Sequence, residues 1–107
     1  MRIIVKEPKK EAYVKEIKGT VEEIQKIIGN GKKLKRIDNL TTWFPIGVFV
    51  TDDWSEKEIN VIDPRDNGVY SGTVVVFQYV GERLVNMSDP FITIVLDTLK
   101  NLDYYNC

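Results

Sequence analysis

The sequence contains no histidine. This absence removes the Ser–His and Cys–His nucleophile pairs, the imidazole metal ligands and the histidine general base on which many enzymes depend. Carboxylate, lysine and tyrosine chemistry remains available, but the absence favours a protein that is not an enzyme. The only cysteine is Cys107, so the chain forms no internal disulfide.

Long apolar runs are also missing from the sequence. No stretch approaches the roughly 18 consecutive apolar residues that indicate a membrane-spanning helix. The start of the chain carries the charged residues Arg2 and Lys6, and it lacks the apolar stretch and the small-residue cleavage site of a signal peptide. We therefore expect a cytoplasmic protein that makes no contact with a membrane.

The composition is that of a soluble globular protein. The chain has 107 residues, of which 43% are hydrophobic and 29% are charged. This length and this balance favour one folded domain over a disordered chain. No internal repeat, low-complexity segment or linker interrupts the sequence. We expect a single domain over residues 1–107.

The charges are sorted along the chain. Residues 1–37 carry eleven Lys or Arg against five Asp or Glu, a net charge of +6, whereas residues 38–107 carry four against eleven, a net charge of −7. Such asymmetry is an argument about partners and electrostatic steering, and not about the fold. We expect one positive face built from Lys9, Lys10, Lys33, Lys35 and Arg36, and an acidic region around Asp52, Asp53, Glu56, Asp63 and Asp66.

Hydrophobic patterning predicts an α+β fold with an antiparallel sheet of five to six strands. Strands are expected over residues 2–7, 12–17, 32–37, 45–50, 58–62 and 69–80. The segment 58–62 is expected to pair with 45–50. The strongest signal is Thr73-Val74-Val75-Val76-Phe77, which is nearly all β-branched or aromatic and indicates the centre of the sheet.

Two helices are expected to pack on one face of this sheet. Thr20 and Glu23 form a capping box before residues 21–28, where apolar residues recur at three- and four-residue spacing. Ser88-Asp89-Pro90 begins a second helix over residues 90–101. Both helices are expected to share one core with Ile4, Val14, Val48, Val74 and Val76.

The densest basic cluster is Lys32-Lys33-Leu34-Lys35-Arg36, which Lys9 and Lys10 could join to contact phosphates. Aromatic side chains that would stack on bases are missing from this cluster. The alternative is an edge strand whose lysines guard it against pairing with another sheet. The residues alone leave both interpretations open.

Two other motifs carry little chemistry. Gly29-Asn30-Gly31-Lys32-Lys33 follows a helix and lacks the G-x-x-x-x-G-K-[ST] spacing, so it favours a helix C-cap over a phosphate loop. Asp52, Asp53, Glu56 and Glu58 lack the ligand spacing and the central glycine of a calcium loop. We expect no metal and no cofactor.

Three large aromatic residues, Trp43, Phe44 and Trp54, flank the strand expected over residues 45–50. Such side chains bury wide areas in cores and are preferred anchors at interfaces. Neighbouring residues of a strand point to opposite faces, so Trp43 and Phe44 cannot both face the core. Ordinary packing and an interaction surface both remain open for them.

Three segments together resemble a known pattern. They are residues 3–17 (IIVKEPKKEAYVKEI), 20–29 (TVEEIQKIIG) and 70–76 (YSGTVVV), followed by the final helix. In this order and spacing they resemble a family of small phage- and mobile-element-encoded domains of unknown function. The matching motifs are structural: a strand, a capped helix and a glycine turn. The resemblance therefore brings no catalytic residues with it.

The resemblance implies an accessory protein of a phage or mobile element, acting in the cytoplasm of a bacterial host. Small proteins of that setting often inhibit host defence by binding, and they include inhibitors of CRISPR nucleases and sponges for nucleotide signals. We therefore predict a non-enzymatic protein that binds and inhibits a host factor. The expected binding residues are Lys9, Lys10, Lys33, Lys35, Arg36, Trp43, Phe44 and Trp54.

Two alternatives to this function stay open, and both use the N-terminal basic residues. One is a small nucleic-acid-binding module. The other is a sponge for a nucleotide messenger, in which the lysines hold phosphate. A host protein is the expected partner, and a homodimer stays open as a further arrangement.

Overall fold

The computed structural model describes residues 1–29, 33–36, 46–51, 58–63, 68–81 and 83–105. Its elements in chain order are β1 (Arg2–Lys6), β2 (Tyr13–Glu16), α1 (Val21–Ile24), the π-helical turn η1 (Gln25–Gly29), β3 (Leu34–Arg36), β4 (Ile46–Thr51), β5 (Ile59–Asp63), β6 (Gly68–Ser71), β7 (Val74–Val80), β8 (Arg83–Val85) and α2 (Asp89–Leu102). The predicted α+β fold is confirmed.

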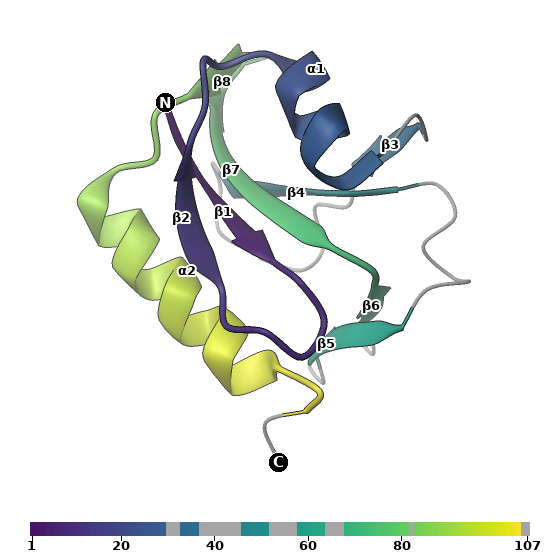
Figure 1. Cartoon of the computed structure of the whole chain (residues 1–107). Coiled ribbons are helices and arrows are strands. Elements are labelled where there is room, and N and C mark those ends of the chain that lie inside the picture. The colour runs from purple at the N-terminus through teal and green to yellow at the C-terminus, as the bar shows by residue number, and fades with distance from the viewer. Residues whose placement is uncertain (30–32, 37–45, 52–57, 64–67, 82, 106–107) are drawn as a thin grey trace.

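Within the described residues, six strands form one antiparallel sheet in the order β2-β1-β7-β4-β3, with β8 pairing beside β7 (Figure 1). The predicted central position of the Val74–Phe77 segment is confirmed, because β7 pairs with both β1 and β4. In the register, Val76 lies opposite Ile4 on one side and Val48 on the other. The apolar run therefore forms the middle of the sheet, as its composition indicates.

A separate ribbon, β5 paired with β6, corrects the expectation that residues 58–62 pair with 45–50. Val61 lies opposite Tyr70 instead. Only residues 64–67 separate these two strands, and a hairpin between neighbours in sequence closes at low entropic cost. The segment 69–80 is likewise two strands rather than one, because Gly72 lies between them with a positive φ of 74°.

The two helices cover opposite faces of the sheet, which corrects the prediction that both pack on one face. Ile24 of α1 packs with Ile3 and Phe77, whereas Val95 and Leu99 of α2 belong to the other core. The reason lies in the central strands. A sheet covered on one face alternates between apolar and polar residues, but the middle strands β1 and β7 are continuous apolar runs, which require cover on both faces.

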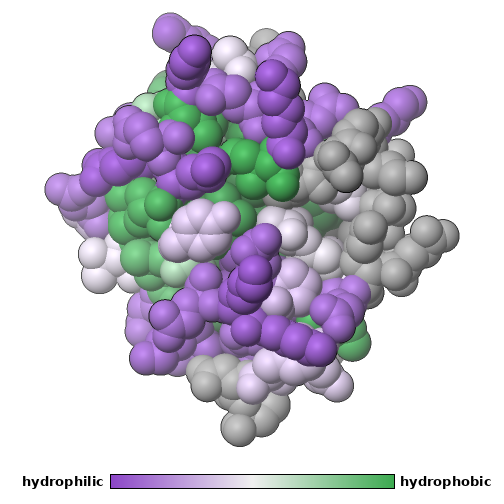
Figure 2. Space-filling model, in the orientation of Figure 1, coloured by the Kyte–Doolittle hydropathy of each residue, from purple (hydrophilic) through white to green (hydrophobic). Residues whose placement is uncertain are grey.

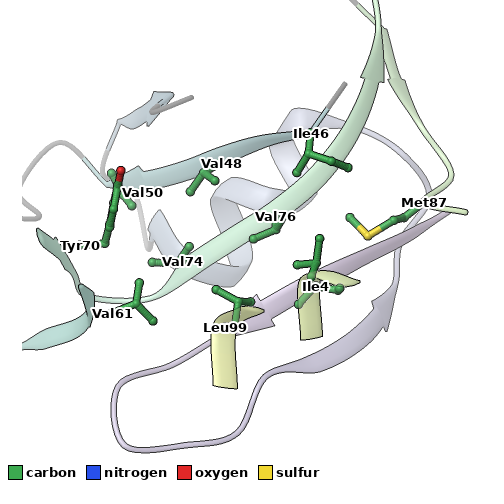
Figure 3. Close-up of a cluster of buried hydrophobic side chains, with 11 residues drawn as sticks. Ile4, Ile46, Val48, Val50, Val61, Tyr70, Val74, Val76, Met87 and Leu99 are labelled. Atoms are coloured by element: carbon green, nitrogen blue, oxygen red, sulfur yellow. The ribbon is translucent and has the colours of Figure 1, made fainter. Parts of the chain in front are cut away.

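Figure 3 shows the core on the α2 side, where Ile4, Val76 and Leu99 point toward one another. Ile4, Val48, Val74 and Val76 are fully buried in this core, as predicted. The further prediction of Val14 as a core residue is wrong, because its side chain is 40% exposed. Val14 belongs to β2, which is an edge strand and is exposed along its whole length.

On the α1 side, the helix begins with the predicted capping box. The backbone N–H of Glu23 donates to Thr20 Oγ1 at 3.3 Å. The Glu23 carboxylate reaches back two residues further than the capping box predicts, past Thr20, and accepts from the N–H of Lys18 at 2.9 and 3.0 Å. Regular α-helix ends at Ile24, and the π-helical turn η1 carries the coil on to Gly29.

The same side of the sheet contains a tight packing contact between Gly47 and Phe77, which lie opposite each other on β4 and β7. A Cβ atom on Gly47 would lie 2.5 Å from Phe77 Cζ. The Phe77 ring also stacks on Phe49, with 4.6 Å between the ring centroids. Glycine at position 47 therefore leaves the space that the buried ring occupies.

Candidate functional site: a lysine-lined cavity

A cavity of about 420 Å³ lies where the turn between β1 and β2 meets the end of α2. These two segments are far apart in sequence but lie side by side in Figure 1. The cavity is lined by four lysines, Lys6, Lys9, Lys10 and Lys100, by the carboxylates of Glu11 and Asp103, and by Ala12, Leu96 and Tyr105. Figure 2 shows mostly hydrophilic residues over this region of the surface.

The turn that contributes Lys9 and Lys10 is built by local sequence. Pro8 fixes its own φ and starts the turn, and the N–H of Lys10 donates to the carbonyl of Glu7 at 3.2 Å. Lys9 adopts a φ of 66°, a left-handed conformation that is unfavourable for a residue with a Cβ atom. The chain accepts this strain in the turn that carries two of the lining lysines.

Lys6 is the buried floor of the cavity, with only 1% of its side chain exposed. Its ammonium has three N–H donors and three acceptors around it. They are the carbonyl of Glu7 at 2.8 Å, Asn60 Oδ1 at 2.9 Å and Asp103 Oδ2 at 3.2 Å. Lys6 is therefore fully partnered within the protein, as a buried charge requires, and its role is to hold the floor in place.

Asn60 completes this floor from β5. Its side-chain amide donates to the carbonyls of Lys6 at 2.7 Å and Gly72 at 2.8 Å. The backbone carbonyl of Asn60 accepts from the N–H of Tyr104 at 3.0 Å. One buried asparagine thus joins β1, the β6–β7 connection and the segment after α2.

Asp103 positions the last lining residue. One carboxylate oxygen pairs with Lys6, and the other accepts from the backbone N–H of Tyr105 at 3.0 Å. Asp103 also forms an isolated bridge with Val61 of β5. These contacts hold the residue that follows α2 against the ribbon and fix the backbone of Tyr105 at the edge of the cavity.

The mouth of the cavity carries exposed charges. Lys9 Nζ lies 3.2 Å from Glu58 Oε1 and 5.3 Å from the centroid of the Tyr105 ring. The hydrogen bond and charge of Glu58, with a further contribution from Tyr105, raise the pKa of Lys9. Lys9 therefore stays protonated at neutral pH, and its side chain is 58% exposed.

Lys10 has a looser partner, since its ammonium lies 3.6 Å from Glu7 Oε2 and its side chain is 70% exposed. Lys100 is exposed on the last turn of α2. The lining residues alone carry four positive and two negative charges. Ion pairs at exposed positions contribute little to stability, so a small anion entering the cavity can exchange with Glu7 and Glu58.

The structure separates the basic residues that were expected to form one face. Lys9 and Lys10 lie beside the cavity, after β1, whereas Lys33 precedes β3 and Lys35 and Arg36 lie within it. β2 and β3 are the opposite edges of the sheet, four strand steps or roughly 19 Å apart. The strand order therefore divides these basic residues into two groups, one beside the cavity and one at the β3 edge, and their common binding role stays a prediction.

Several predicted site residues lie outside the described residues. They are the three aromatic residues Trp43, Phe44 and Trp54, and the acidic residues Asp52, Asp53, Glu56 and Asp66. Asp63 is the last residue of β5. The binding role of the aromatic residues and the acidic region therefore stay predictions.

Sequence reasoning missed Lys6, Asn60, Lys100, Asp103 and Tyr105 as parts of one site. The sequence contains one signal of this site. In a strand, residues two apart share a face, so Lys6 stands on the face of Ile4, which is a core position. A lysine on a core-facing position of a buried strand predicts a buried partner of opposite charge.

Comparison of the chain with family models, with curated proteins and with solved structures found no match. The resemblance to phage-encoded domains therefore rests on the sequence motifs alone. None of the described helices is long and apolar enough to cross a membrane.

Proposed function

We propose that this protein is a binding protein without catalytic activity, and that it holds a small phosphorylated anion in the lysine-lined cavity. The observation that carries this proposal is the convergence of four lysines on one cavity of about 420 Å³. This volume lies within the range of roughly 300–1,000 Å³ that is typical of small-molecule sites. The ammonium of Lys6 already has three partners in the floor of the cavity. Lys9, Lys10 and Lys100 at the mouth therefore make the contacts to the anion.

Among the functions considered from the sequence, this geometry supports the sponge for a phosphate-bearing messenger. A sponge needs a cavity that holds the ligand and requires no catalytic group. An accessory protein of that kind also suits the phage setting that the sequence motifs imply. Inhibition of a host protein stays a prediction, because the aromatic residues proposed for it lie outside the described residues.

The nucleic-acid-binding module has less support. A single-stranded nucleic acid is typically bound along a continuous basic groove with aromatic stacking platforms, and a duplex along several adjacent phosphate contacts. The two basic groups lie at opposite edges of the sheet instead. The cavity at Lys9 and Lys10 suits a compact anion better than a polymer.

Titration calorimetry with pyrophosphate at an ionic strength of about 0.1 M tests the proposal. The wild-type chain is expected to bind, and the double variant Lys10→Gln/Lys100→Gln is expected to lose at least tenfold in affinity. The matched control is Lys15→Gln/Lys26→Gln, which makes the same charge change at exposed positions. Lys15 lies opposite Ile3, on the α1 side of the sheet. Lys26 lies in η1, which follows α1.

The control variant should bind within about twofold of the wild type, because Lys15 and Lys26 do not line the cavity and salt at about 0.1 M screens exposed charges over roughly 10 Å. Equal losses of affinity in both double variants would show that net charge alone, and not these two lysines, controls binding. Absence of pyrophosphate binding by the wild type, even at low salt, would overturn the proposed function.

A further inference from the structure

Tyr105 is the only aromatic residue that lines the cavity within the described part of the chain. Its backbone is held by Asp103 Oδ1, and its ring packs edge to face against Tyr104, with 5.0 Å between centroids and 80° between planes. The side chain remains 43% exposed. The ring therefore contacts one neighbouring ring and lines the cavity.

A cation lies over the exposed face of the Tyr105 ring. The ammonium of Lys9 lies over the Tyr105 ring at 5.3 Å from its centroid. Lys9 is 58% exposed on a flexible stem, so it can leave the ring when a stronger anion than Glu58 is present. A flat group can then take its place, because an aromatic ring stacks on other π systems as well as on cations.

The remaining lining residues divide the cavity into a charged part and an apolar part. Lys10 and Lys100 provide ammonium groups, whereas Ala12 and Leu96 provide apolar surface. A bare phosphate would use only the charged part. A ligand that uses both parts carries phosphate at one end and an apolar or flat group at the other.

We infer that the ligand is a nucleotide, whose phosphates contact Lys10 and Lys100 and whose base stacks on Tyr105 against the apolar part of the cavity. This inference rests on the proposed function, since it names the class of phosphorylated anion. Lys9 moves from the Tyr105 ring and Glu58 to the phosphates as the base enters. Tyr105 is then the residue that distinguishes a nucleotide from an inorganic phosphate.

The test compares ADP with pyrophosphate, which share a diphosphate and differ by the nucleoside. Affinities are measured by calorimetry for the wild type, for Tyr105→Leu, for Tyr105→Phe and for the control Tyr13→Leu. Tyr13 is an equally exposed tyrosine on β2, at 42%, and it lies opposite Val5, a residue of the α1-side core.

The wild type is expected to prefer ADP to pyrophosphate by roughly 5- to 100-fold, the range that stacking of one base on an aromatic side chain provides. Tyr105→Leu should remove this preference and leave pyrophosphate binding within about threefold. Tyr105→Phe and Tyr13→Leu should keep the preference.

Three outcomes would overturn the inference, and they are distinguishable from one another. Equal binding of ADP and pyrophosphate by the wild type leaves the proposed function standing but removes the nucleotide. Equal weakening of both ligands in Tyr105→Leu shows that Tyr105 only holds Lys9 in place. Failure of the wild type to bind either ligand removes the proposed function together with the inference.

Discussion

The ammonium of Lys6 and the carboxylate of Asp103 lie 3.2 Å apart, with 1% and 14% of their side chains exposed. This pair joins the last residue of β1 to the first residue after α2. Because both groups are largely removed from water, neither can lose its partner without a large desolvation cost. The pair therefore ties the floor of the cavity to the stability of the fold.

Lys6→Met should lower the free energy of unfolding by about 3 kcal/mol, because it leaves Asp103 as a buried charge without its partner. Urea unfolding followed by circular dichroism measures the change. Adding Asp103→Asn should restore part of the loss, since the unpaired charge is then gone. A double variant no more stable than Lys6→Met would show that pairing with Asp103 is not the reason for the loss.

Val76→Asp tests the centre of the sheet. Val76 is fully buried between β1 and β4, so an aspartate there should destabilise the fold by more than about 3 kcal/mol. The same substitution at Val80, which is 60% exposed at the end of the same strand, is the matched control and should cost much less. Similar melting temperatures for the two variants would contradict the central position of Val76.

Gly47→Ala should destabilise the protein by about 1–3 kcal/mol, because the new methyl group overlaps the Phe77 ring. The cost should shrink in a Phe77→Leu background, where the ring no longer occupies that space. Gly81→Ala provides a contrast. The φ of Gly81 is +60° and a Cβ atom added there would meet nothing within 4 Å, so the cost comes from the backbone and should not change in that background. Equal costs of Gly47→Ala in both backgrounds would rule out the steric explanation.

The helix cap predicts a pH dependence of stability. Hydrogen bonds from the backbone of Lys18, and further ones from Thr20, lower the pKa of Glu23 below its ordinary value. A carboxyl whose pKa is lower in the folded state stabilises the fold above the unfolded value, and this contribution disappears as the pH falls through the folded value. Unfolding curves of wild type and Glu23→Gln should therefore differ at pH 7, begin to converge as the pH falls through the ordinary glutamate range, and coincide once it is below the lowered folded pKa. A difference that persists unchanged at low pH would assign the effect to something other than ionisation.

Glu58 is expected to compete with the ligand for Lys9. Glu58→Gln removes the anion that lies 3.2 Å from the Lys9 ammonium, so pyrophosphate should bind several-fold more tightly. Glu22→Gln makes the same charge change at an exposed position on α1. An equal gain in both variants would mean that net charge, rather than release of Lys9, controls the affinity.

Local sequence patterns were sufficient to predict most of the helices and strands. The β-branched runs of β1 and β7, the capping box at Thr20 and the turn at Pro8 each depend on neighbours in sequence. Which strands become neighbours depends on distant contacts, so the β5–β6 pairing was missed. The short strand β8 was missed because Arg83–Val85 is too brief to show a period.

The candidate site was predicted only at Lys9 and Lys10. Its other members come together through tertiary contacts, as Lys6 and Asn60 do across 54 residues of sequence. No spacing of residues along the chain indicates a contact between positions so far apart in sequence. The placement of the helices on opposite faces could have been predicted from the sequence. Ile3 and Ile4 are adjacent apolar residues of one strand, so they point to opposite faces, and the structure buries both of them fully.

The pairing of β1 with β7 also governs how the protein assembles. These two strands form the middle of the sheet, yet the whole chain up to Val80 must be synthesised before they can meet. At about 5–20 residues per second, a ribosome needs several seconds to cover that stretch. Until then the edge of β1 that pairs with β7 has no native partner, and pairings between strands so far apart in sequence form slowly. We therefore expect the central sheet to form only after synthesis has passed β7, so a chain truncated before β7 should not fold.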